Sequence, residues 1–316
     1  MRVEKEMDID IRKVKTYSIK KRFSKVKKDS FAKVCARGDS FNSFLNALPD
    51  ILKAKDFKNI VEDVVKARKK RKPLILMMGA HVIKCGLNPL LIDLMRKKVI
   101  TALVLNGAGI IHDFEIAYQG QTSEDVAAAL QDGSFGMGEE TAEFINNAVN
   151  RGVKEGRGIG EAVSRAIDRE KLKFRKQSIL YHCYKEGIPV SVQVAIGTDI
   201  IHQHPSFDGA STGEGSKRDF LKLVTSVAKL GNGGVVLNFG SNVIMPEVFL
   251  KALNLARNLG YKVNNFTTAN FDMIYHYRPA VNFVSRPTQI SGKGYYIVGH
   301  HELLLPLLHR AIVEKI

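Results

Sequence analysis

The sequence predicts an α/β protein in which a doubly wound, mostly parallel sheet carries helices on both faces. Residues 74–78 and 100–105 form short apolar runs without alternation, which is typical of strands that are covered on both faces. Between them lies an apolar-periodic segment that opens at Asn88 and Pro89, so the three form a βαβ pattern. Strand, polar loop and helix follow one another again near residues 79, 106, 197, 240 and 270. Such loops at one edge of a sheet would line a single crevice.

The first 72 residues are predicted to be a basic N-terminal extension with two helices, at about residues 40–55 and 57–72. Pro73 stops the second helix before the first strand. We expect residues 73–316 to form a single α/β domain, because no linker or repeat divides them. Further strands are predicted near residues 190–196, 235–239 and 261–269, and helices near residues 110–118, 123–130, 139–151, 178–185, 220–230 and 246–259.

The composition is that of a globular protein with an uneven charge. The net charge is +16, and residues 1–72 hold 22 Lys and Arg against 10 Asp and Glu, which is +12 of that total. A basic arm of this kind suits nucleic acid or anionic lipid, but it carries no nucleic-acid motif, so we do not expect nucleic acid as the partner. No apolar run approaches the ~20 residues of a membrane span. The three cysteines lie far apart, and we expect a cytoplasmic protein without membrane attachment.

The loop formed by Asn106, Gly107, Ala108 and Gly109 could present backbone amides to a phosphate at a helix N-terminus. The usual dinucleotide fingerprint has a third glycine where this chain has His112. A tight turn between strand and helix explains the same residues equally well.

Carboxylates follow several of the predicted strands, at Asp113, Asp199, Asp208 and Asp272. Acids at a cleft suit a cationic amine or a ribose hydroxyl, although Asp is also a favoured helix cap. The C-terminal region concentrates the cation donors His276, Arg278, Arg286 and Lys293, which either bind an anion or form internal ion pairs.

Five segments of the chain, from about residue 73 to the C-terminus, are similar to the deoxyhypusine synthase family. They are GAHVIKCGL from Gly79, NGAGIIHDF from Asn106, GTDIIHQHPSFDG from Gly197, TTANFD from Thr267 and HELLLPLLHRAI from His301. The resemblance implies a Rossmann-like fold that binds NAD, a homotetramer with sites at subunit interfaces, and oxidation of a polyamine or related amine to an imine. The aminoalkyl group would then pass to an acceptor protein through a lysine of the enzyme.

The resemblance also implies roles for individual residues. One register of the C-terminal motif puts Thr288 at the position of the family's lysine, and another puts Lys293 there. We therefore expect catalytic roles for Lys293 and His112. NAD is expected to contact Asn106, Gly107, Ala108, Gly109, Asp113, Asp199, Thr268 and Asp272. The substrate is expected to contact His81, His204, Asp208, Arg278 and Arg286.

Two other classes of function fit parts of the sequence. His202 and His204, two residues apart, could hold a metal together with Asp199. The chain would then be a metal-dependent hydrolase. A polar loop lining the crevice explains the same residues. The third class is a non-catalytic binding protein that uses its basic arm.

Overall fold

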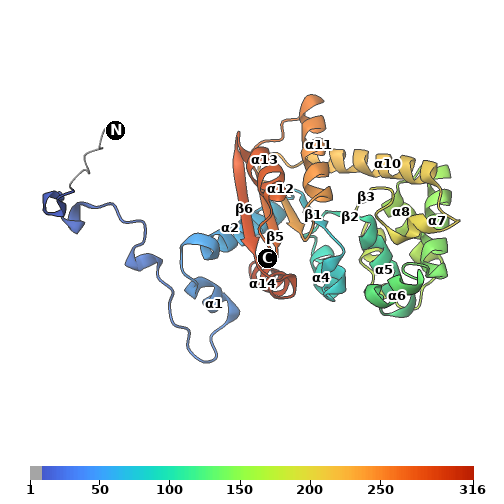
Figure 1. Cartoon of the computed structure of the whole chain (residues 1–316), viewed down its shortest axis with the longest axis horizontal. Coiled ribbons are helices and arrows are strands. Elements are labelled where there is room, and N and C mark those ends of the chain that lie inside the picture. Colours follow the sequence, from blue (N-terminus) through green and yellow to red (C-terminus); the bar gives the residue numbers. More distant parts are fainter. Residues whose placement is uncertain (1–8) are drawn as a thin grey trace, which may run out of the picture.

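The computed structural model describes residues 9–316, and its centre is a six-stranded sheet in which neighbouring strands are parallel (Figure 1). The strands are β1 (Leu74–Met78), β2 (Ala102–Asn106), β3 (Val190–Gln193), β4 (Val235–Phe239), β5 (Phe266–Asp272) and β6 (Gly292–Val298). Their order across the sheet is β3-β2-β1-β4-β5-β6, so the direction of strand addition reverses between β1 and β4. This order confirms the doubly wound fold, in which ligands bind at the carboxyl edge near such a reversal.

Helices cover both faces of the sheet. In chain order, the helices of the described residues are α1 (Phe41–Ala47), α2 (Leu52–Lys69), α3 (His81–Lys84), α4 (Asn88–Arg96), α5 (Gly107–Gln119), α6 (Val126–Asp132), α7 (Glu139–Lys154), α8 (Ile159–Arg169), α9 (Ile179–Glu186), α10 (Gly209–Val227), α11 (Ile244–Asn258), α12 (Tyr277–Pro279), the π-helical η6 (Ala280–Ser285), α13 (Arg286–Thr288) and α14 (His301–Val313). Two short 3-10 turns, η4 (Arg175–Gln177) and η5 (Ile200–Gln203), precede α9 and α10. The core on one face includes α2, α4, α5 and α14, and the core on the other face includes α10, α11 and η6.

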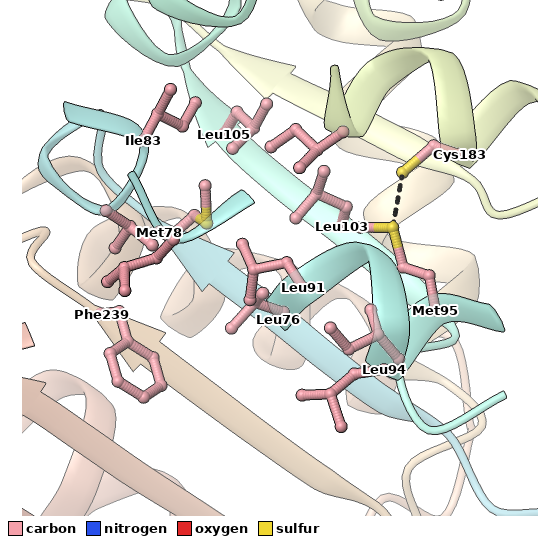
Figure 2. Packing of buried hydrophobic residues seen from close by; sticks show 14 of the residues in the cluster. Leu76, Met78, Ile83, Leu91, Leu94, Met95, Leu103, Leu105, Cys183 and Phe239 are labelled. Carbon is pink, nitrogen blue, oxygen red and sulfur yellow. Dashed lines mark hydrogen bonds between the residues drawn. The ribbon is translucent and has the colours of Figure 1, made fainter. Parts of the chain in front are cut away.

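The strands are apolar without alternation because each of them packs against both layers of helices. Within β1, Leu76 belongs to the core under α4 and Met77 to the core under α11. Figure 2 shows the first of these cores, where Leu91 of α4 lies beside Leu76. In the same core, Cys183 Sγ lies 3.8 Å from Met95 Sδ, which joins α9 to α4.

α2 belongs to the α/β unit, although it precedes residue 73. Ile60 is fully buried in the core, and the Asp63 carboxylate accepts hydrogen bonds from Thr267 Oγ1 (2.9 Å) and Lys293 Nζ (2.7 Å) on β5 and β6. The division predicted at residue 72 therefore does not separate two packed units. The change in charge suggested that division, but the apolar face of α2 decides where the helix packs.

Residues 9–40 form an extended arm that projects from the body of the molecule (Figure 1). It contains three 3-10 turns, η1 (Ile11–Lys13), η2 (Ile19–Lys21) and η3 (Lys28–Ser30), and none of its residues is buried. Across residues 9–316, none of the helices combines the length and the apolar character that crossing a bilayer requires.

Candidate functional site

The backbones of β1 and β4 approach closely where the strand order reverses. Gly79 N–H donates to Phe239 O (2.9 Å), and Gly240 N–H donates to Phe271 O (3.1 Å). A Cβ on Gly79 would lie 2.3 Å from Gly240 O, and Gly240 itself has a φ of +61°. Both positions therefore require glycine, and the loops after β1, β4 and β5 meet at one place.

A row of buried polar side chains follows β4 and β5 toward this edge. Asn238 pairs with Asn270 in the sheet register, and Thr268, Asn270 and Asp272 alternate along β5, so all four point to the face that α11 covers. Asn238 Nδ2 donates to Asn270 Oδ1 (2.5 Å) and to Ser241 O (2.9 Å). Within residues 9–316, no hydrogen-bond partner is present for Asn238 Oδ1, Thr268 Oγ1, Asn270 Nδ2 or Asp272 Oδ2.

Such a row is costly unless something else completes its hydrogen bonds. Each buried polar atom without a partner costs about 1–3 kcal/mol. Native proteins leave few such atoms, and they concentrate where a ligand or water supplies the missing partner. The side chains of this row offer acceptors, a donor and a hydroxyl, which is the mixture that a sugar or an amide group needs.

His301 completes this site from a third element, since it begins α14 just after β6. Its side chain is buried, and both ring nitrogens lack a partner among residues 9–316. The imidazole lies against Gly240, since a Cβ on that residue would lie 2.6 Å from His301 Nε2. The ring centroids of His81 and Phe239 each lie 5.8 Å from the ring centroid of His301.

Burial lowers the pKa of His301 below its usual range, and the nearby charge of Asp272 only partly opposes this effect. The imidazole is therefore neutral at pH 7 and can accept a proton or a hydrogen bond. His301 was not among the predicted site residues. The available signal was its place directly after a strand and at the start of a helix, which puts it at the carboxyl edge of the sheet.

Asp199 covers the N-terminus of α5, where the sequence predicted a phosphate. Asn106 caps the helix, since its Oδ1 accepts a hydrogen bond from Gly109 N–H (3.0 Å). A Cβ on Gly107 would lie 1.8 Å from Asp199 Oδ2, so the carboxylate rests on the first turn. Burial raises the pKa of Asp199 to about 6, although the backbone N–H of Ala108 opposes the shift. The predicted phosphate position is thus filled by the protein's own carboxylate.

Asp113 does not contact the crevice, and its prediction as a cofactor ligand is wrong. Its side chain is fully buried and accepts hydrogen bonds from Ser178 Oγ (2.5 Å), Ile179 N–H (2.8 Å), Leu180 N–H (3.0 Å) and Asn88 Nδ2 (3.1 Å). Asp113 therefore holds the N-terminus of α9 against α5 and has no lone pair to spare for a ribose.

Lys293 lies at the amino edge of the sheet, opposite to the crevice. It is the second residue of β6 and pairs with Thr267, one residue after the start of β5. Its Nζ forms an ion pair with Asp63 Oδ1 (2.7 Å). The five-residue rise from Lys293 to Val298, the end of the strand, is roughly 16–17 Å. The prediction of Lys293 as the imine-forming lysine is therefore wrong, and Thr288, whose Oγ1 donates to Val284 O (2.7 Å), also lies at this edge.

The other predicted residues mostly serve local contacts. His112 Nδ1 lies 2.6 Å from Thr122 Oγ1 and 3.5 Å from Glu115 Oε2, in a network on the flank of α5, so the structure does not bring it to the β4–β5 row. Asp208 caps α10 by accepting from Ser211 N–H (2.7 Å).

The two predicted arginines form internal contacts instead of a free anion clamp. Arg278 Nη1 lies 2.9 Å from Glu247 Oε1, and Arg286 Nη1 donates to Asn282 Oδ1 (2.7 Å). Of the predicted residues, Asp272 and His81 are the ones that the structure gathers around His301 and Gly240. Thr268 lies four residues before Asp272 on β5, opposite Val236, and does not reach this end of the sheet.

The metal site proposed for a hydrolase is not formed. His202 Nδ1 accepts from Gly197 N–H (3.0 Å), and His204 Nε2 donates to Gly136 O (2.9 Å), so the two rings serve different parts of the loop. In the part of the chain that the structure describes, no three His, Cys, Asp or Glu side chains are placed to share an ion.

No protein-family model and no curated protein sequence matches this chain. Solved structures do match its fold. A candidate LOR/SDH protein from Methanococcus maripaludis S2 has a TM-score of 0.53 and 18% identity over 84% of this chain and 71% of its own. The ternary complex of AgrE with ornithine and NAD+ has a TM-score of 0.53 and 17% identity over 82% of this chain and 33% of its own.

A candidate deoxyhypusine synthase from Entamoeba histolytica matches over nearly its whole length, with a TM-score of 0.51 and 11% identity over 88% of this chain and 94% of its own. The chain spans about a third of AgrE. At identities this low, the structural matches establish the fold alone. They confirm the expected similarity to the deoxyhypusine synthase type of α/β fold.

Proposed function

We propose that this protein binds NAD across the carboxyl edge of the sheet and oxidises a small amine. The observation that carries the proposal is the group of buried polar atoms without partners on Asn238, Asn270, Asp272 and His301. It lies beside the glycine contact between β1 and β4, at the position where doubly wound sheets bind dinucleotides. NAD+ is named in a complex of AgrE, whose fold is similar.

The residues present fit the cofactor at this end of the crevice. Asp272 Oδ2 is free to accept from a ribose hydroxyl, and Asn270 Nδ2 can donate to an amide oxygen or to a second hydroxyl. The N-terminus of α5 fits a phosphate only after Asp199 moves away from Gly107. When bound, NAD supplies the hydride acceptor for amine oxidation.

His301 is the group that we assign to proton transfer. Oxidation of an amine breaks a C–H bond, forms a C=N bond and releases a proton from nitrogen. A neutral, buried imidazole can take that proton at Nε2, which faces Gly240. Ornithine, the amine named in the AgrE complex, and polyamines are the substrates to test first.

Transfer of an aminoalkyl group to an acceptor protein is the finer form of this proposal. Because Lys293 faces the opposite edge, the amine of the acceptor would add directly to the imine carbon, without an enzyme lysine. The bond from that carbon to the original amine would then break, that amine would leave, and the new imine would be reduced by the NADH formed in the oxidation. We also propose that the protein forms a homotetramer. Four exposed apolar side chains at or beyond the ends of β5 and β6 support this, because a second copy of the chain could cover them: Ile274, Tyr275, Tyr277 and Val298.

A matched pair of histidine variants tests the proposal. His301→Gln keeps a polar side chain but cannot take up the proton, whereas the neighbouring His300→Gln changes an exposed residue that is paired with Glu302. In NAD titrations by calorimetry, we expect binding to the wild type and to His300→Gln. In a separate activity assay, we expect amine-dependent NADH formation to be lost in His301→Gln alone. An absence of NAD binding by the pure wild-type protein contradicts the proposal.

A further inference from the structure

A second concave region lies at the amino edge of the sheet, opposite to the crevice. It is a groove of about 1020 Å³ whose floor is formed by Pro73, Ala102 and Pro189, the residues at the starts of β1, β2 and β3. This volume is in the upper range of small-molecule sites.

The groove is lined with cations and with no acidic residue. The cations are Arg68, Lys70, Arg71, Lys72, Lys98 and Lys229. Among residues 9–316, none of these has a carboxylate oxygen within 4.0 Å, whereas the adjacent Lys97 is paired with Asp93. Arg68 Nε and Lys72 Nζ instead donate to the carbonyls of Lys97 (3.0 Å) and Gly231 (2.9 Å).

Helix dipoles account for only part of this charge. α2, α4 and α10 all end at the groove, and each C-terminus is equivalent to roughly half a negative charge. Three helix ends offset about 1.5 of the six positive charges. The remaining excess needs a counter-charge that the described chain does not supply.

Two of the cations occupy backbone positions that favour glycine. Arg71 has a φ of +52° and Lys98 a φ of +56°, just after the ends of α2 and α4. Glycine adopts this conformation at no steric cost, while other residues lose about 1 kcal/mol. The sequence thus places a long cation at both positions against the local preference of the backbone, and both side chains line the groove.

We propose that this groove binds a compact small molecule carrying several phosphate groups. Arginine and lysine bind phosphate oxygens by charge-assisted hydrogen bonds. No aromatic side chain lines the groove to stack on a base, and no carboxylate lines it to accept from a ribose, so the lining selects for phosphate itself. The site lies on the far edge from the NAD crevice and does not depend on the function proposed above.

The experiment compares two lysine-to-glycine variants of the full chain. Lys98→Gly removes a groove cation, and Lys171→Gly removes a lysine of nearly equal φ (+51°) at the end of α8, which is not among the groove residues. Glycine suits both positions, so both variants should fold. Binding of sodium tripolyphosphate is measured by calorimetry at fixed ionic strength.

We expect tripolyphosphate to bind the wild type and Lys171→Gly equally and to bind Lys98→Gly roughly tenfold more weakly, as the loss of one charge-assisted contact predicts. Arg71→Gly should weaken binding similarly. Equal binding by all variants, or equal weakening in Lys171→Gly, overturns the proposal. Binding of a DNA or RNA duplex without binding of tripolyphosphate also overturns it, because the groove would then be part of a nucleic-acid surface.

Discussion

Replacing Thr268 by valine should stabilise the protein and leave its response to NAD unchanged. The Thr268 side chain is fully buried on β5, and its hydroxyl has no partner within residues 9–316. Valine has the same shape and removes the desolvated hydroxyl. The expected gain is about 1–3 kcal/mol in the free energy of unfolding, which corresponds to roughly 1.5–4.5 °C in Tm for a chain of this length.

The response to NAD should stay the same, because Thr268 lies four residues before Asp272 on β5 and faces the core under α11. NAD at a hundred times its Kd stabilises the folded state by about 2.7 kcal/mol. The same increment is expected for Thr268→Val. Thermal unfolding of Thr268→Val with and without NAD measures both effects in one experiment.

The adjacent threonine is a matched control on the opposite face of the same strand. Thr267 Oγ1 donates to Asp63 Oδ2 (2.9 Å), so Thr267→Val should cost about 1–3 kcal/mol and leave the NAD increment unchanged. Our reasoning is refuted if Thr268→Val destabilises the protein without NAD, since the hydroxyl would then already be bonded. A reduced NAD increment in Thr268→Val would refute the placement of the cofactor at the carboxyl edge.

Two further variants address Asp199 and Lys293. Burial raises the pKa of Asp199 from 3.8 to about 6, so its folded form binds a proton more tightly and its contribution to stability is lost as pH rises from about 4 to 6. Asp199→Asn should therefore be more stable than the wild type by about 2–3 kcal/mol at pH 7. Chemical denaturation should show that this difference becomes small near pH 4. A constant difference between pH 4 and pH 7 contradicts the raised pKa of Asp199. Lys293→Met should lose about 1 kcal/mol with its partly exposed ion pair to Asp63, and NAD binding should persist. Borohydride treatment of the wild type with NAD and an amine should leave residue 293 unmodified, and mass mapping of an adduct there would overturn its placement at the far edge.

The fold could be predicted because its signals are local. The apolar runs at β1 and β2 and the periodic α4 between them define a βαβ unit without knowledge of distant residues. The loops after the strands were also assigned to one edge correctly, since all strands of a parallel sheet end on the same side. His301, which follows the last strand, obeys the same rule.

The roles of the individual polar residues could not be assigned in the same way. Asp113, Asp199 and Asp272 all follow strands, yet Asp113 caps α9, Asp199 rests on the first turn of α5 and Asp272 lies beside His301. Within residues 9–316, Asp199 Oδ2 and Asp272 Oδ2 both lack a hydrogen-bond partner, whereas the Asp113 carboxylate is fully bonded. Lys293 was assigned to the site through a motif register, but the start of β6 puts it at the other edge. A difference of a few residues along a strand exchanges one edge for the other, which no spacing rule resolves.

The parallel α/β architecture can be predicted from the chain alone, because strand burial and helix periodicity depend on neighbouring residues. Which side chains of that architecture face a ligand follows only from the folded arrangement. A carboxylate or an imidazole can be satisfied by a helix end as well as by a substrate, and the choice depends on distances between segments that are far apart in the chain.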